Sequence, residues 1–372
     1  MTITTHSPYN LNLQKVGVKV KKAAKHPYFV YFVAGALLLI ALALKEVNVL
    51  ESSVVNSFSS LIFYYIAALG LSLLLGYGGL ASLGTAGFMG IGAYVVAIIF
   101  KRPVDDPDAL QAFFSWPIWS GVIIAIGVAI IVGTSVGFVS LRIEGIYLAI
   151  VTLGISEVFI KTIENLPNYT GGAAGIRMPN MELFGQVIAL KNNNEWIVFV
   201  LFVVILMLVL MMTVNIMKSP TGRAMLSMKN STSAAQAMGI SLLKYRLLTF
   251  VFATCYAALA GTMNMMFVRS SIPNAWSLTL SLNLLAAVII GGAKSIGGVA
   301  AGTFFVFGLK DFVYDRIPFI QKQPNAYLLI NGIFIVIVVM FYPGGLSRIP
   351  TDIVNITKKL INKWRVYKYG TN

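Results

Sequence analysis

The feature that most constrains this chain is its series of long, unbroken apolar stretches, which are separated by short polar loops. A helix that crosses a membrane needs about 20 consecutive, mainly apolar residues. The stretches lack the alternating segments that are typical of outer-membrane barrel strands. Charged residues make up 11% of the 372 residues and apolar residues 58%, too few charges to cover a water-facing surface. A soluble enzyme, a disordered chain and a disulfide scaffold are therefore excluded, and an all-α, polytopic membrane helical bundle is predicted.

The positions of the apolar stretches predict about ten membrane spans. They lie near residues 28–44, 58–75, 86–100, 117–139, 147–163, 196–214, 246–268, 281–293, 297–313 and 326–342. The segments 281–293 and 297–313 are short, and glycines flank the break between them at Ala293–Ile296. Interrupted helices at membrane depth are tolerated only where protein or a water-filled cavity shields the backbone. Transporters place such helices at the substrate path, so we predict one or more broken helices.

The distribution of charge predicts the orientation of the bundle. Basic residues concentrate in the tail 1–27, the tail 347–372 and the loop 215–245, whereas most acidic residues fall on the opposite side. Because cytoplasmic segments carry the excess of Lys and Arg, both termini and this loop are predicted to be cytoplasmic. The segment 28–346 is then the transmembrane domain, with 164–195 as a long outer loop. The net charge of +15 is explained by membrane orientation rather than by nucleic acid, although the tails could also hold anionic lipid.

Residues that carry most enzyme chemistry are scarce. His6 and His26 lie in the polar N-terminal tail, and the single cysteine, Cys255, lies inside an apolar run. No metal cluster, Cys–His pair or His-based triad can be built from them, so we expect no catalytic residue, no metal site and no resident cofactor. The segment Gly291–Ser295 lacks the glycine spacing of a phosphate-binding loop. Transport driven by ATP would therefore need a partner subunit that binds the nucleotide.

The inner loop contains a predicted amphipathic helix outside the bilayer core, which Thr221 can cap and Gly239 can end. The residues that fall near one face of this helix are Met225, Met228, Ala235 and Met238. The loop could lie on lipid as an interfacial helix, or it could dock a cytoplasmic partner. The residues alone leave both interpretations open.

Glu157 is the one acidic residue well inside a predicted span. Charged residues at membrane depth are costly and usually functional. The favoured interpretation is an ion pair with Lys161, one turn later on the same helix face, and the alternative is a role in the transport path. A proton-coupled carrier usually shows several such groups, so a secondary carrier and an intramembrane protease are disfavoured.

Six segments, in order, resemble permease subunits of bacterial ATP-binding-cassette (ABC) importers for branched-chain amino acids, a family that shares features with nucleoside and ribose permeases. The segments are Ser82–Tyr94, Leu141–Gly154, Thr170–Ile176, Gly222–Ile240, Ile290–Gly298 and Pro343–Leu346. The resemblance implies a translocation subunit in a bacterial plasma membrane. It also implies a second, related permease, two ATPase subunits that bind ATP and Mg, and an extracellular substrate-binding protein.

The resemblance also assigns roles to particular residues. The inner loop would be the coupling helix on the ATPase, through Gly222, Arg223, Met228, Lys229, Ala234, Ala235 and Gly239. The outer loop with Thr170, Gly171 and Gly172 would face the binding protein. The translocation path or its gate would involve Gly84, Thr85, Gly87, Glu157, Gly291 and Gly292.

The sequence departs from the family pattern in two places. Thr85 stands where the family usually has His or Gln, and Lys229 is followed by Asn230, Ser231 and Thr232 rather than by acidic residues. A coupling loop without acids implies either an altered cleft in the ATPase or weakened coupling. Nucleosides, simple sugars and urea stay as alternative substrates, because related permeases share part of this loop. A membrane-embedded enzyme is less favoured than a permease for any of these substrates.

Overall fold

The computed structural model describes residues 52–100, 118–140, 146–178, 181–183, 186–188, 195–312 and 345–348, together with isolated positions near residue 36 and between 329 and 340. The predicted spans 28–44 and 326–342 lie outside the described residues except at those isolated positions. Both basic tails lie outside them as well, apart from Ser347 and Arg348. The number of spans and the location of the termini therefore stay predictions.

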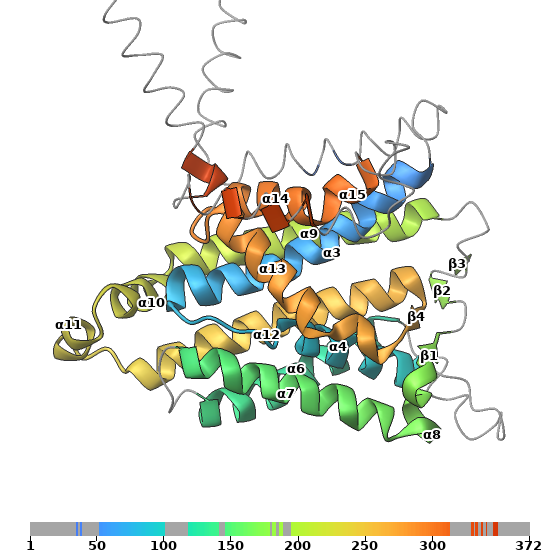
Figure 1. Ribbon diagram of the computed structural model, residues 1–372, viewed down its shortest axis with the longest axis horizontal. Helices are drawn as coiled ribbons and strands as arrows, with labels where there is room; N and C mark the ends of the chain where they lie inside the picture. The colour runs from blue at the N-terminus through green and yellow to red at the C-terminus, as the bar shows by residue number, and fades with distance from the viewer. Residues whose placement is uncertain are drawn as a thin grey trace, which may run out of the picture.

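The described chain is a bundle of apolar helices that run along the long axis of the molecule (Figure 1). Its main helices are α3 (Ser52–Ser72), α4 (Thr85–Phe100), α6 (Ile118–Ser140), α7 (Ile146–Glu164), α9 (Glu195–Lys218), α12 (Leu242–Val268), α13 (Leu278–Gly291) and α14 (Ile296–Thr303). The π-helix η1 (Leu73–Gly78) continues α3, and η4 (Phe304–Gly308) and α15 (Leu309–Phe312) continue α14. Each predicted span between residues 58 and 313 coincides with one of these helical runs, which confirms the all-α membrane bundle.

Five helices among the described residues are long and apolar enough to cross a membrane. They are Val54–Gly78, Trp119–Phe138, Trp196–Lys218, Leu242–Val268 and Pro273–Gly291. Two shorter apolar helices cover Thr85–Phe100 and Ile296–Gly308.

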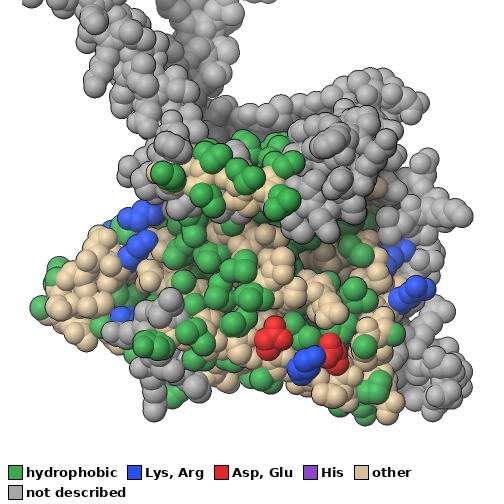
Figure 2. Space-filling model, in the orientation of Figure 1, with side chains coloured by type: hydrophobic (Ala, Val, Ile, Leu, Met, Phe, Trp, Pro, Cys, Tyr) green, Lys and Arg blue, Asp and Glu red, His purple; other side chains and the backbone are tan. Residues whose placement is uncertain are grey.

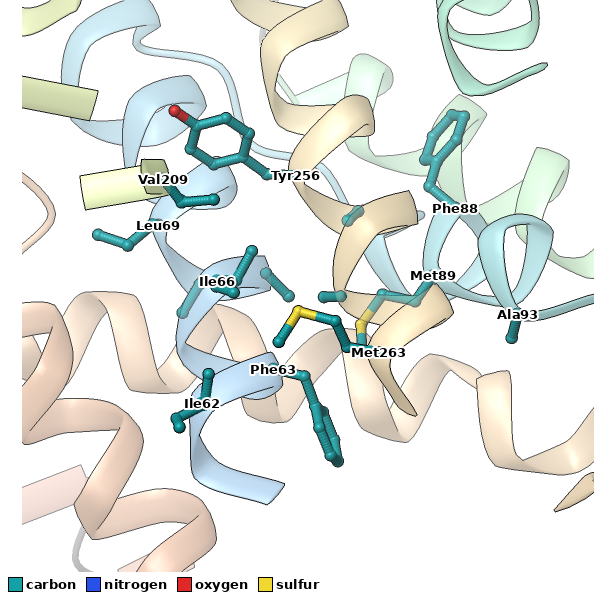
Figure 3. Packing of buried hydrophobic residues seen from close by; sticks show 14 of the residues in the cluster. Ile62, Phe63, Ile66, Leu69, Phe88, Met89, Ala93, Val209, Tyr256 and Met263 are labelled. Carbon is teal, nitrogen blue, oxygen red and sulfur yellow. The ribbon is translucent and has the colours of Figure 1, made fainter. Parts of the chain in front are cut away.

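The core of the bundle forms where α12 packs between α3, α4 and α6. Figure 3 shows Phe63 and Ile66 of α3, Met89 of α4 and Met263 of α12 meeting in this core. The α4 and α12 backbones lie close together because each helix places a glycine against the backbone of the other. A Cβ atom at Gly261 would overlap the carbonyl group of Met89. Small residues at such crossings are the usual means of packing helices in membranes.

The end of the bundle that carries the predicted outer loop contains short elements that the all-α prediction did not include. They are α8 (Pro167–Thr170), η2 (Gly172–Ala174), β1 (Ile176–Arg177), β2 (Met181–Leu183), β3 (Gln186–Ile188), β4 (Ser270–Ser271) and η3 (Pro273–Trp276). Strand β1 pairs antiparallel with β4, so that Ile176 lies opposite Ser271, and β2 pairs antiparallel with β3. The β1–β4 pair ties the outer loop to the end of α12.

The predicted inner loop lies at the opposite end of the bundle from these strands (Figure 1). It folds into α10 (Pro220–Asn230) and α11 (Thr232–Ala237). The one further described element, η6 (Leu346–Arg348), packs against α13 and α14. The two long loops therefore project from opposite ends of the bundle, as the sequence predicts.

Candidate functional site

Helix α10 is fixed to the end of α9 through its first turn. The Ser219 hydroxyl accepts a hydrogen bond from the Gly222 N–H at 3.2 Å and donates to the Ile216 carbonyl at 2.7 Å. Pro220 follows as the first helical residue, a position where its missing N–H is harmless. A Cβ atom at Gly222 would overlap the carbonyls of Ile216 and Met217. Ser219 is therefore the cap, and the predicted cap at Thr221 is wrong.

The inner loop contains two helices rather than the one amphipathic helix predicted. Ser231 adopts an extended backbone conformation and ends α10, and its hydroxyl accepts from the Ala234 N–H at 3.3 Å to begin α11. Hydroxyl side chains that bond to nearby backbone compete with a continuous helix in this way. Of the four residues predicted to share one helix face, Met225, Met228 and Ala235 are buried, whereas Met238 is 80% exposed. Because the helix breaks at Ser231, Met238 does not lie on the same face as Met225 and Met228, as it would on a single helix.

Lys229, in the last turn of α10, connects this loop to a distant helix. Its Nζ atom donates hydrogen bonds to the carbonyls of Leu75 at 2.8 Å and Gly76 at 3.0 Å. Partial burial, followed by the nearby charge of Lys294, lowers the pKa of Lys229 below its ordinary value. The exposed Arg223, by contrast, donates locally, to the carbonyl of Lys218 five residues earlier, at 3.3 Å. The sequence places Lys229 in the predicted coupling loop, but it does not predict the hydrogen bonds to the Leu75 and Gly76 carbonyls.

The break predicted at the glycines after α13 is present. Helix α13 ends at Gly291, and Gly292 has a φ of 95°, which favours glycine. Ser295 caps α14 by accepting from the Gly298 N–H at 3.1 Å. Gly345 packs directly on the backbone of Gly292. The fifth and sixth segments of the family resemblance therefore meet at this break.

A second cluster of predicted path residues surrounds the start of α4. Gly84 packs against the Thr152 carbonyl of α7, and Gly87 packs against Ser156 one turn later. The Leu83 N–H donates to the Thr152 hydroxyl at 3.1 Å, and the Ala86 N–H donates to the Ser281 hydroxyl at 3.0 Å. These hydroxyls satisfy backbone donors at the buried helix start.

The remaining polar groups of this cluster include one without a partner. Thr85 is buried, with 5% of its surface exposed. The Ser156 hydroxyl is also buried and has no hydrogen-bond partner within the described part of the chain. The sequence identifies Gly84, Thr85 and Gly87, but not the Thr152, Ser156 and Ser281 hydroxyls around them, because their sequence positions do not show which face of each helix is buried.

The predicted ion pair between Glu157 and Lys161 is wrong. The Lys161 ammonium instead contacts the Glu164 carboxylate at 2.7 Å. Glu157 is exposed on the outer face of α7. On the face drawn in Figure 2, acidic and basic side chains lie together over α7, and the other basic side chains lie toward the two ends of the bundle. Glu164, three residues after Lys161 and beyond the apolar stretch, is a better partner than Glu157. The Lys161 ammonium can reach it while lying close to the end of the helix.

The predicted contact residues of the outer loop have a structural role. Thr170 is buried, and its hydroxyl donates to the carbonyls of Ile163 at 2.6 Å and Leu166 at 2.7 Å. Gly172 is also buried, whereas Ala173 and Ala174 beside it are exposed. Thr170 therefore shapes the loop, and its neighbours form the exposed surface.

The structure brings some of the candidate residues together and keeps others apart. Lys229, Gly76 and the break after Gly292 meet at the inner end of the bundle. Thr170 lies at the outer end, and the α4–α7 contact lies between the two. The described residues contain no group of three or more His, Cys, Asp and Glu side chains that could hold a metal ion.

Comparisons with known proteins identify related permease components. The family described as branched-chain amino acid transport system / permease component matches residues 53–339. The high-affinity branched-chain amino acid transport system permease protein LivM of Escherichia coli is 27% identical over 329 residues, which cover 83% of this chain and 73% of that protein. LivM of Salmonella typhimurium is 27% identical over 304 residues, which cover 76% of this chain and 67% of that protein.

An archaeal protein is also similar. The probable branched-chain amino acid transport permease protein LivM of Methanocaldococcus jannaschii is 25% identical over 314 residues, which cover 76% of this chain and 90% of that protein. No solved structure matches the chain significantly. Together with the apolar helices, these relatives identify a multi-pass protein of the bacterial inner membrane. Because the family match covers most of the helical bundle, the chain belongs to the family of permease components of branched-chain amino acid transport systems.

Proposed function

We propose that the chain is the membrane-spanning permease subunit of an ABC importer that carries Leu, Ile and Val. A second, related permease, two ATPase subunits that bind ATP and Mg, and an extracellular binding protein complete the assembly. The observation that carries the proposal is the construction of the α10–α11 loop. Its base is packed on α9 through Gly222, and its tip projects beyond the membrane helices (Figure 1).

The exposed surface of α11 favours docking to a protein through neutral contacts. Helix α11 contains no charged residue, and Met238, which follows it, is 80% exposed. A membrane-surface helix would instead present basic residues beside its apolar face. Ala234 and Gly239 keep this surface small, so that a cleft in the ATPase can approach the backbone. Lys229 points back to the bundle and so needs no acidic neighbour, which accounts for the missing acids of the family pattern.

The proposed path residues other than Glu157 fall in two places that helix movement would open. Gly84 and Gly87 let α4 approach α7, and the unpartnered Ser156 hydroxyl lies in this contact. Gly291 and Gly292 form the break after α13. Discontinuous helices in transporters border the substrate path. At the outer end, the loop shaped by Thr170, Gly171 and Gly172 faces the binding protein through its exposed neighbours.

The experiment that tests this function is reconstitution of the native complex. Gentle solubilisation should recover the chain with a related permease and ATPase subunits. In liposomes that contain this complex and the binding protein outside, internal ATP should drive uptake of radiolabelled leucine. Uptake should continue when an uncoupler collapses the proton gradient and ATP is maintained. Recovery of the chain alone in several mild detergents, or uptake that stops with the proton gradient, would contradict the proposal.

A further inference from the structure

The hydrogen bonds of Lys229 join two elements that are far apart in the sequence. Leu75 and Gly76 lie in η1, about 150 residues before Lys229, and both carbonyls accept from the same ammonium group. The aliphatic part of Lys229 lies against Gly79, where a Cβ atom would come within 3.0 Å of the lysine Cγ atom. Gly79 also has a φ of 69°, which favours glycine. The backbone of this turn is therefore shaped to receive the lysine.

The accepting carbonyls belong to the end of a helix. The last carbonyls of a helix have no partner within it. The N–H groups of Gly79 and Leu80 both bond to the Leu74 carbonyl, which leaves the following carbonyls to other donors. A cation at a helix C-terminus is also favoured by the helix dipole. Lys229 thus caps the α3–η1 helix from a different part of the chain.

The capped end lies directly beside the break between α13 and α14. A Cβ atom at Gly76 would overlap the carbonyl group of Ala293, which lies in the break. On α3, the Tyr65 hydroxyl donates to the Ile296 carbonyl at 3.0 Å, where α14 begins. The α3–η1 helix therefore contacts the break near both of its ends. Any displacement of η1 has to change the backbone contacts of the broken helix, because no flexible side chain separates Gly76 from Ala293.

The lysine is placed where movement of the docking loop would reach it. It lies two residues before Ser231, at which α10 ends and α11 begins. Met225 and Met228 are buried between α10 and the bundle. We therefore expect α10 to move as a rigid body. Movement of α11 by a bound ATPase would pass through the end of α10 to the Lys229 ammonium.

We propose that Lys229 is a positioning residue that couples the ATPase-docking loop to the broken helix, through its two hydrogen bonds to the end of η1. This inference rests on the proposed importer function. Coupling between two sites requires a physical element that both can bias, and the η1 end is that element here. The lysine would not contact substrate; it would set how far the break moves for each ATP hydrolysed.

The test compares uptake with ATP hydrolysis in the complete importer, reconstituted with its ATPase subunits and binding protein. Lys229→Met keeps the aliphatic stem and removes the hydrogen-bond donors. We expect it to assemble and hydrolyse ATP, but to import at least about fivefold less leucine per ATP, the lower end of usual allosteric coupling. Lys229→Arg keeps donors and charge and should restore most of the ratio. Lys244→Met is the matched control, since the Lys244 Nζ atom lies over its neighbour Tyr245 instead.

The outcomes separate coupling from folding and from the importer function itself. Wild-type leucine uptake per ATP in Lys229→Met would overturn the proposal. If Lys229→Met fails to assemble, Lys229→Gln should assemble and show the lowered ratio, and failure of both neutral variants would make Lys229 a folding residue and overturn the coupling role. Wild-type protein without ATP-driven uptake would contradict the proposed function itself, independently of any change at Lys229.

Discussion

At the scale of single residues, backbone contact rather than flexibility requires glycine on both sides of the break after α13. A Cβ atom at Gly291 would overlap the Gly298 carbonyl, and a Cβ atom at Gly298 would overlap the Gly291 carbonyl. Gly297, the neighbour of Gly298 in α14, has nothing within 4 Å of the same position. The two helices therefore meet through Gly291 and Gly298, while Gly297 points into open space.

This difference predicts opposite effects of the same substitution. Gly291→Ala should lower the stability of the purified permease by about 1–3 kcal/mol, the usual cost of overpacking. Gly297→Ala should be neutral or stabilise by up to about 1 kcal/mol, because alanine favours a helix over glycine. Thermal unfolding in one detergent measures both variants. Equal tolerance of alanine at the two positions would contradict the close packing of α13 on α14.

The sequence predicts such sites only in part. The density of glycines around residues 291–298 indicates a break, and the break is there. It does not distinguish Gly291 from Gly297, since the deciding atom belongs to a backbone that returns from the other side of the break. The hydrogen bonds of Lys229 cannot be predicted from the sequence either. Their acceptors are backbone carbonyl groups, which every residue carries.

At the scale of elements, the α10–α11 loop combines a buried base with an exposed tip. Met228 in α10 is 1% exposed, whereas Met238 beyond α11 is 80% exposed. The apolar pattern predicts both methionines on one helix face, because helical spacing continues through Ser231. The local hydrogen bond of the Ser231 hydroxyl ends the helix there, and pattern reasoning does not detect such a change of direction. The same limit applies to the π-helices η1 and η4, which the periodicity does not reveal.

The two methionines predict a separation of folding from docking. Met228→Ala should destabilise the isolated permease by about 2–5 kcal/mol, because it removes a buried side chain. Met238→Ala should leave that stability unchanged and weaken association with the ATPase by at least about fivefold, as truncation of a central interface residue does. Unfolding of the permease and titration with purified ATPase subunits measure the two effects. Undiminished ATPase affinity in Met238→Ala would place docking elsewhere on the loop.

At the scale of the whole molecule, the exposed face of α7 combines a carboxylate with apolar side chains. This face exposes Glu157 together with the apolar residues Ile150 and Val158, which are 55% and 67% exposed. Gly154, one turn before Val158, has nothing within 4 Å of a built Cβ atom. A carboxylate against lipid is unfavourable, and acidic residues in membrane helices face a bundle interior or an aqueous cavity. This face therefore suits contact with the proposed second permease, and a substrate path between the two permeases would pass Glu157.

That placement predicts that Glu157 matters for transport and not for stability. Glu157→Gln should leave thermal unfolding of the permease unchanged, since the structure shows the side chain exposed. It should lower leucine uptake by the assembled importer by at least about tenfold, the lower end of what one hydrogen bond to a charged group contributes. Glu164→Gln is the matched control: it removes the ion pair with Lys161, and exposed ion pairs contribute little. Normal uptake by Glu157→Gln would exclude the exposed face of α7 from the path, and a parallel loss of stability would make Glu157 a packing residue. A selective loss of uptake is the result that a carboxylate facing the path requires.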